Sequence, residues 1–188
     1  KNWRFDTRAG KEEIQNRIVG ENELSAIQVC LAIADAQREF SDIMRDLTGK
    51  PEYAQLLEST KGMKNGLYWE AAQGEEPSPL GPLVARARSE GYSEEEGFPS
   101  PYHGYFYRIL KGQGKNASGG AYDYLIKGKM IGGFAIVGYP ASYGVSGVYT
   151  FIANHDGVVY RKNLGQNTKS VAMAMKKFDP DKTWKKVE

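Results

Sequence analysis

Apolar residues recur every three or four positions through the first quarter of the chain. One series begins with Leu24 and Ile27, and a second series, displaced around the axis, begins at Ile33 and reaches Leu47. This spacing predicts an amphipathic helix with a wide apolar face. About 25 residues at 1.5 Å each give a rod of ~38 Å, long enough to lie across a whole sheet.

Signals for both ends of this helix flank the pattern. Asn22 is a suitable N-cap, and Gly49 followed by Pro51 ends the helix after Thr48. Proline is favoured in the first turn of a helix, so Pro51 is expected to open a second, short helix over residues 52–59.

The twenty residues before Asn22 predict two smaller elements. A short helix over residues 11–19, acidic at its start, ends at Gly20, and "NWRFDTRAG" alternates as in a strand that stops at a turn. The first residue is Lys1 rather than Met, so we expect a signal, an anchor or a domain upstream. Residues 1–20 are interpreted as the end of that missing segment.

Residues 61–100 contain little regular pattern. "GMKNGLYW" predicts a turn and a short strand, and "LVARARSEG" a short helix. Between and after them lie the proline-rich "GEEPSPLGP" and the acidic "SEEEGFPSP". We expect an insertion that wraps around a scaffold, which is where specificity is usually found.

The second half of the chain has the two-residue period of strands. "YHGYFYRIL", "MIGGFAIVGY", "GVYTFIA" and "VVYRKN" predict four strands. Asp156 and Gly157, between the last two, indicate a type I′ hairpin turn, in which both central residues have positive φ. A helix in "TKSVAMAMKKF", capped by Asn167 or Thr168, and an extended tail complete the chain.

This order of elements predicts one α+β domain over residues 1–188. A long N-terminal helix packs on an antiparallel meander of about four strands, with the loop-rich insertion between helix and sheet. Alternating strand and helix units are missing from the pattern, which argues against a parallel doubly wound sheet. One face of the sheet is expected to bury Phe106, Ile126, Phe134, Ile136, Phe151 and Val159. Tyr105 and Tyr107 alternate with Phe106 and are expected on the wetter face.

The formal net charge of +2 hides an asymmetry. Residues 1–100 carry 12 basic and 18 acidic side chains, and residues 101–188 carry 13 and 5. The halves can attract each other, or the basic half can attract an anionic partner. The lysines are spread singly and no RNA-binding motif is present, so nucleic acid is not an expected partner. No stretch approaches the roughly 18 apolar residues of a membrane span.

The sequence offers little support for a metal site or a cofactor site. Two histidines and the single Cys30, which we expect to be a buried small hydrophobe, cannot form a closed zinc site of four N or S ligands. Calcium is less excluded, because Asp123 and Asp156 could supply oxygen ligands, but no EF-hand loop is present. The glycine-rich residues 112–120 lack the lysine spacing of a phosphate loop and predict a mobile hairpin connection. No cofactor and no metal are therefore expected.

Catalytic motifs are equally sparse. Ser146 stands in "YGVSGVY", which lacks the strand-to-helix turn of a nucleophile elbow. The glutamates at 75, 76 and 94–96 are adjacent in loops, whereas paired acid–base work needs two carboxylates at a fixed separation. His103 follows Pro101 at the start of a strand, where an imidazole commonly bonds a backbone carbonyl or a loop acid. The alternative is that His103 is catalytic.

Tyrosine is the least ordinary feature of the composition. Nine of the twelve tyrosines lie between Tyr102 and Tyr160. Strands favour tyrosine, but binding surfaces also use its apolar ring and polar tip. The candidate binding residues are His103, Tyr105, Tyr107, Arg108, Tyr139, Tyr143, His155 and Asp156.

Several motifs carry a resemblance to a known family. "WRFDTRAGKEEIQNRIVGENELSAI", "GLYW", "SPLGPL", "PYHGYFYRIL" and "GGFAIVGYPASYGVSGVYTFIANHDGVVYRKNLG" resemble the uncharacterised bacterial family DUF2950 over nearly the whole chain. The resemblance implies an exported protein with a signal and a further segment upstream, and it implies no activity and no catalytic residue.

A weaker resemblance is to the soluble heads of type IV pilins and type II secretion pseudopilins. "NELSAIQVCLAIADAQREF" is similar to the helix that enters the pilin head, and "FAIVGYP", "GVSGVYTFIAN" and "DGVVY" to its last strands. The apolar N-terminal segment that polymerises pilins is absent from this sequence. A shared fold is implied, but not fibre formation.

Two hypotheses follow. The first is a non-catalytic extracytoplasmic protein, periplasmic or secreted, that presents a tyrosine-rich surface and the 61–100 insertion to a protein or glycan of the cell envelope. The second is a cell-envelope hydrolase with its site around His103. A carboxylate, or His155, within hydrogen-bond reach of His103 in a concave pocket would favour the enzyme.

Overall fold

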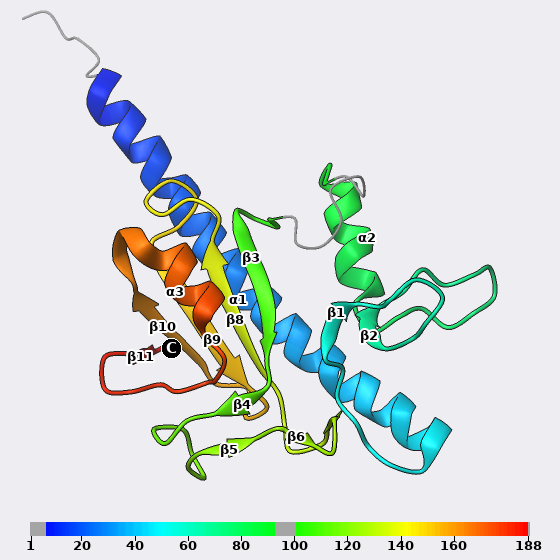
Figure 1. Cartoon of the computed structure of the whole chain (residues 1–188). Helices are drawn as coiled ribbons and strands as arrows, with labels where there is room; N and C mark the ends of the chain where they lie inside the picture. The colour runs from blue at the N-terminus through cyan, green and yellow to red at the C-terminus, as the bar shows by residue number, and fades with distance from the viewer. Residues whose placement is uncertain (1–6, 93–100, 188) are drawn as a thin grey trace, which may run out of the picture.

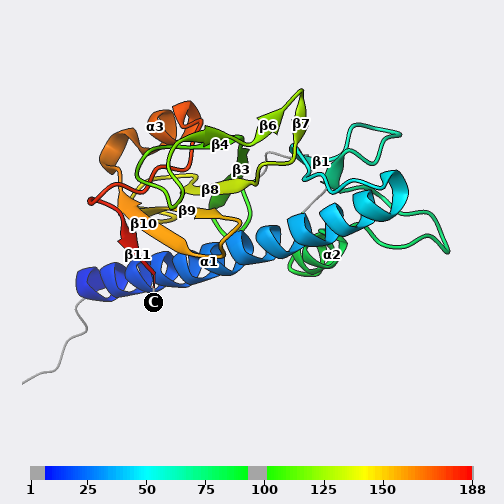
Figure 2. The same ribbon diagram turned by 90° about the horizontal axis from the view of Figure 1, so that it is seen from below.

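The computed structural model describes residues 7–92 and 101–187. One long helix, α1 (Thr7–Thr48), lies across one face of a five-stranded sheet, and the short helix α3 (Thr168–Ala174) lies on the opposite face (Figures 1 and 2). The α+β class and the long N-terminal helix are confirmed. In the described residues no helix combines the length and the apolar character needed to cross a bilayer.

The main sheet has the strand order β11-β10-β9-β8-β3, and every neighbouring pair is antiparallel. Its strands are β3 (Tyr105–Leu110), β8 (Ala135–Pro140), β9 (Tyr149–Asn154), β10 (Val159–Asn163) and β11 (Lys185–Lys186). The predicted meander is thus present. It has five strands rather than about four, because the extended tail pairs with β10 through β11.

Small elements occupy the connections. They are β1 (Leu56–Glu58), β2 (Gly66–Tyr68), α2 (Gly81–Ser89), β4 (Gly112–Gln113), β5 (Tyr122–Asp123), β6 (Leu125–Ile126), β7 (Lys129–Met130) and the 3-10 turn η2 (Gly165–Asn167). The strand in "GLYW" and the helix in "LVARARSEG" are confirmed by β2 and α2. The strand expected at the N-terminus and the acidic loop lie largely outside the described residues.

The core forms between α1 and the sheet. All six residues of β8 are buried, since α1 covers one of its faces and α3 the other. The buried residues of α1 begin only at Ala26, and the N-terminal part of this helix projects beyond the sheet (Figure 1).

Two predictions about the N-terminal region are wrong. Residues 11–19 are not a separate helix, because α1 runs through Gly20 without a break. A mid-helix glycine costs only about 1 kcal/mol relative to alanine, which the long helix tolerates. Residues 52–59 form no helix but include β1, parallel to β2. Gln37 fixes the chain there, because its side-chain amide exchanges two 2.8 Å hydrogen bonds with the backbone of Ala54.

The expected facing of β3 is also wrong. Tyr105 is 0% and Tyr107 7% exposed, whereas Phe106 is only partly buried. The tyrosine face is the one that α1 covers: a Cβ on Gly138 would lie 3.1 Å from the Tyr107 ring and 3.2 Å from the Cys30 sulfur. Ile126, expected in the core, is exposed, whereas the expected burial of Phe134, Ile136, Phe151 and Val159 is confirmed.

The hairpin between β9 and β10 is confirmed, but its turn type is not. The Gly157 amide donates to the Asn154 carbonyl and Gly157 has φ +76°, whereas neither His155 nor Asp156 has positive φ. The glycine-rich residues 112–120 do form a hairpin connection, from β4 to β5, and the Gln113 side chain fixes it through two carbonyls.

The predicted cap of α3 is only partly right. Asn167 occupies the N-cap position, but its side chain makes no capping hydrogen bond. The Thr168 hydroxyl instead donates to the carbonyl of Gly165, the first residue of the 3-10 turn that precedes the helix. The side chain therefore stabilises the preceding turn rather than the first turn of α3.

Candidate functional site

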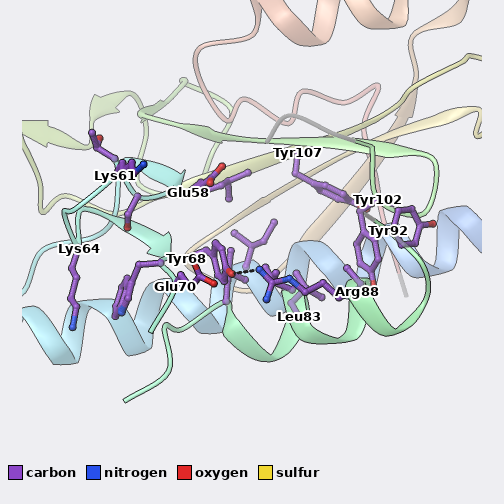
Figure 3. Close-up of a pocket in the computed structure, with 18 of the residues that line it drawn as sticks. Glu58, Lys61, Lys64, Tyr68, Glu70, Leu83, Arg88, Tyr92, Tyr102 and Tyr107 are labelled. Carbon is purple, nitrogen blue, oxygen red and sulfur yellow. Dashed lines mark hydrogen bonds between the residues drawn. The ribbon is translucent and has the colours of Figure 1, made fainter. Parts of the chain in front are cut away.

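A groove of about 700 Å³ lies between α1, α2, the β1–β2 pair and the chain that enters β3 (Figure 3). Its size is within the usual range for ligand sites. Most of its lining comes from the 61–100 insertion and the residues just before it, so the insertion turns one edge of the scaffold into a concave surface.

The floor of the groove is apolar. Val29 and Ile33 contribute from α1, and both are almost fully buried. Leu80 and Leu83 contribute from the start of α2, and Leu57 from β1. Apolar ligand groups that cover this floor would be removed from water, which is the main favourable contribution to binding in such sites.

Charged side chains stand over the aromatic rings of the rim. The Arg88 Nη2 atom donates a 2.7 Å hydrogen bond to the Tyr68 hydroxyl, and the guanidinium lies 5.8 Å from the centre of that ring (Figure 3). The Lys64 ammonium lies 5.5 Å from the centre of the Trp69 ring and 3.4 Å from the Glu75 carboxylate. These contacts tie the rim together across separate segments of the insertion.

One carboxylate lies beside the groove and bonds Tyr102 of its lining. Glu90, just beyond α2, accepts hydrogen bonds from Arg86 Nε at 2.9 Å and from the Tyr102 hydroxyl at 3.1 Å. His103 Nε2 lies 3.2 Å from the same carboxylate. Tyr92 packs edge-on against Tyr102, with ring centres 4.9 Å apart, and its hydroxyl accepts from the His103 amide.

The protonation states follow from these contacts. The pKa of Glu90 lies below its usual value, chiefly because Arg86 donates to it. Burial raises the pKa of Tyr102 to about 12, and the hydrogen bond to Glu90 adds to the effect. Glu90 is therefore ionised and Tyr102 is a neutral donor at neutral pH.

The backbone at His103 is set by a two-residue turn. His103 and Gly104 both have positive φ, +48° and +70°, and Tyr102 and Tyr105 exchange backbone hydrogen bonds across them. This is the pattern of a type I′ turn, which the sequence predicted at Asp156 and Gly157 instead. The turn holds the imidazole against Glu90.

The chemical capacity of this cluster is that of an oriented imidazole. Nε2 faces the Glu90 carboxylate, whereas Nδ1 of His103 has no hydrogen-bond partner among the residues described. A carboxylate that fixes one ring nitrogen leaves the other available to accept or donate a proton. Among the described residues no group of three or more His, Cys, Asp or Glu side chains could hold a metal ion.

The predicted site residues on β3 have mainly structural contacts. The Tyr105 hydroxyl donates to the Tyr149 carbonyl, and Arg108 Nη2 donates to two carbonyls at the end of α3. Tyr139 is 5% exposed. Of the β3 residues proposed for binding, Tyr107 is the one that lines the groove.

The remaining predicted residues lie elsewhere. His155 lies 3.7 Å from Asp156 at the end of β9, and Tyr143 is in the loop before β9. The register pairs Tyr105 with the last residue of β8 and Asn154 with its first, so His103 and His155 stand at opposite ends of the sheet. The eight predicted residues therefore do not form one site.

Sequence reasoning missed most of the groove. Tyr68, Trp69, Arg88 and Tyr92 were not named as candidates, although the insertion that carries them was expected to hold specificity. A usable signal was the pair of patterned segments "GLYW" and "LVARARSEG", since aromatic and basic residues together in an irregular region are typical of binding surfaces.

Comparison with known proteins gives a family but no activity. The family model described as "Protein of unknown function (DUF2950)" matches residues 1–187. Neither the curated proteins nor the solved structures gave a match. The similarity to pilin heads stays a prediction.

Proposed function

The chain belongs to the DUF2950 family, and from that premise we propose that it is a non-catalytic extracytoplasmic binding protein whose ligand occupies the groove. The observation that carries the proposal is the groove itself, with an apolar floor, an aromatic rim and charged side chains of both signs. Proteins commonly place a ligand in a concavity of this composition.

The tyrosines that can contact a ligand are not the ones predicted from the sequence. Tyr105 and Tyr139 are buried and cannot contact a partner. Tyr68, Tyr92 and Tyr102 line the groove and supply the apolar rings and polar tips that the composition suggested. A protein or glycan of the cell envelope is the proposed ligand, and the exported character implied by the family resemblance supports the location.

A groove-filling substitution tests the binding site. Ala87 lines the groove from α2, and Ala85 is exposed on the same helix outside it. Protein with ¹⁵N-labelled tryptophan would be titrated with peptide and glycan fractions of a cell-envelope digest. We expect the Trp69 indole resonance to shift with one fraction, the shift to disappear in Ala87→Phe and to persist in Ala85→Phe. No shift with any fraction would contradict the proposal.

A hydrolase with its site around His103 is the second candidate. The contact between His103 and Glu90 beside the groove favours it, because a carboxylate that orients an imidazole is a common acid–base arrangement. The test is release of new amino or reducing ends from the same fractions. Turnover that His103→Ala abolishes, with the Trp69 shift retained, would support the hydrolase and contradict a non-catalytic role.

A further inference from the structure

We infer that the ligand of the groove is an extended peptide segment with apolar side chains, rather than a glycan or an acyl chain. The inference rests on the proposed function and narrows its ligand class. It is carried by the packing of the aromatic rings, by the charges of the rim and by the apolar floor.

The aromatic rings are poorly placed to stack on sugars. Sugar rings pack on exposed aromatic faces, but Lys64 stands over one face of Trp69 and Arg88 over one face of Tyr68. Tyr102 packs on His103 with ring centres 4.1 Å apart, and Tyr92 packs edge-on against Tyr102. Each ring is already packed against a neighbouring side chain and lines the side of the groove. A narrow apolar groove of this kind accommodates the side chains of a ligand better than flat sugar rings.

The charges of the rim are mixed. Three basic residues, Lys61, Lys64 and Arg88, line the groove together with the acidic Glu58 and Glu70 (Figure 3). Lys64 is also close to the Glu75 carboxylate. A site for a polyanion needs a surplus of cations, and a site for an acyl chain needs no charge along its length. Charges of both signs complement a peptide, whose amide groups and polar side chains offer donors and acceptors alternately.

The floor and the rim together match the alternation of an extended chain. In an extended peptide successive side chains point to opposite sides, so every second side chain faces the same surface. The half-buried side chains of Leu57, Leu83 and Val84 line the groove and would contact that apolar set. The residues between would face the charged rim and solvent.

The Trp69 indole gives a direct readout. Its N–H is buried and has no acceptor among the described residues, and the residue lines the groove, so a ring or a charge that binds in the groove changes the resonance through space. The chain has three tryptophans, and Trp69→Phe assigns the signal.

Three defined probes test the ligand class on the full chain. They are a pool of capped hexapeptides with leucine, valine or phenylalanine at alternate positions, chitotriose, and decanoate. The same peptides with serine at those positions are the control. We expect the apolar pool alone to shift the Trp69 resonance, with at least tenfold weaker binding of the serine peptides.

Each other outcome overturns the inference in a distinguishable way. A Trp69 shift with chitotriose or decanoate but not with peptides would overturn the peptide class and leave groove binding intact. Equal binding of apolar and serine peptides would remove the role of the floor. No Trp69 shift with any probe or with any envelope fraction would overturn both the inference and the proposed function.

Discussion

The His103 imidazole contacts the Glu90 carboxylate at 3.2 Å and so joins the turn before β3 to the end of α2. Because Glu90 also accepts hydrogen bonds from Arg86 and Tyr102, three side chains from two segments converge on one carboxylate. This cluster links the end of α2 to Tyr102, which lines the groove.

Replacing Glu90 tests the cluster through its pH dependence. The lowered pKa of Glu90 means that the carboxylate stabilises the fold above its ordinary pKa of about 4.3, and that this contribution is lost as pH falls through the lower folded-state value. We therefore expect Glu90→Gln to lower the free energy of unfolding at pH 7 and to differ less from wild type at pH 3, measured by urea unfolding. Glu12→Gln, in an exposed pair with Arg8, is the control. A difference that is the same at both pH values would rule out the cluster.

Gly20 in α1 and Gly157 in the turn after β9 lead to opposite predictions. Gly20 is within α1 with open space around its Cβ position, so Gly20→Ala should stabilise the protein by about 0.5–1 kcal/mol. Gly157 has φ +76°, so Gly157→Val should destabilise it by more than about 1 kcal/mol. Chemical denaturation of each variant would measure the change in the free energy of unfolding. Loss of stability in Gly20→Ala would mean that the helix breaks there.

The amide of Gln37 anchors the start of the insertion. Its side chain is fully buried, and Gln37→Leu leaves the Ala54 amide and carbonyl without partners. We expect a loss of about 1–3 kcal/mol per unsatisfied group, and faster amide exchange at Ala54. Gln28→Leu, on the exposed side of α1, is the matched control. Equal stability of the two variants would contradict the anchoring role.

Alkaline pH should destabilise the fold. Burial raises the pKa of Cys30 to about 12 and also raises the pKa of Tyr105, Tyr107 and Tyr124. The unfolded chain therefore binds fewer protons than the folded chain above the ordinary pKa values, and the free energy of unfolding falls as pH rises.

The Cys30 thiol should lower the free energy of unfolding from roughly pH 8.5, and the buried tyrosines should lower it further from roughly pH 10. Urea midpoints at pH 7, 9 and 10.5 would show the fall, and Cys30→Ala should remove only the earlier part. A constant midpoint from pH 7 to 10.5 would mean that these groups are exposed.

Periodicity in the sequence was enough to predict the scaffold. The apolar spacing around Ile27 and Ile33 identified the long helix, and the alternation in the second half identified the strands that became β3, β8, β9 and β10. These patterns depend only on residues close together in the sequence, because the period of the apolar positions indicates whether a segment is a helix or a strand.

The wrong predictions concern features that depend on contacts between segments far apart in the sequence. Which face of β3 is buried depends on the small Gly138 in the neighbouring strand and on Cys30 in α1, which together leave room for Tyr107. Residues 52–59 have helical propensity, but Gln37 and the parallel partner β2 hold them extended. The groove is assembled from three separated segments, so no single pattern in the sequence could identify it.

The most direct test of the groove as the binding site is the affinity for the apolar hexapeptide pool, measured by calorimetry on wild type, Ala87→Phe and Ala85→Phe. Ala87 faces the groove and Ala85 does not, so the two variants differ only in where the ring is added. We predict at least tenfold weaker binding for Ala87→Phe and wild-type binding for Ala85→Phe, with both variants folded by circular dichroism. Equal affinity of all three proteins would contradict the assignment of the groove as the binding site.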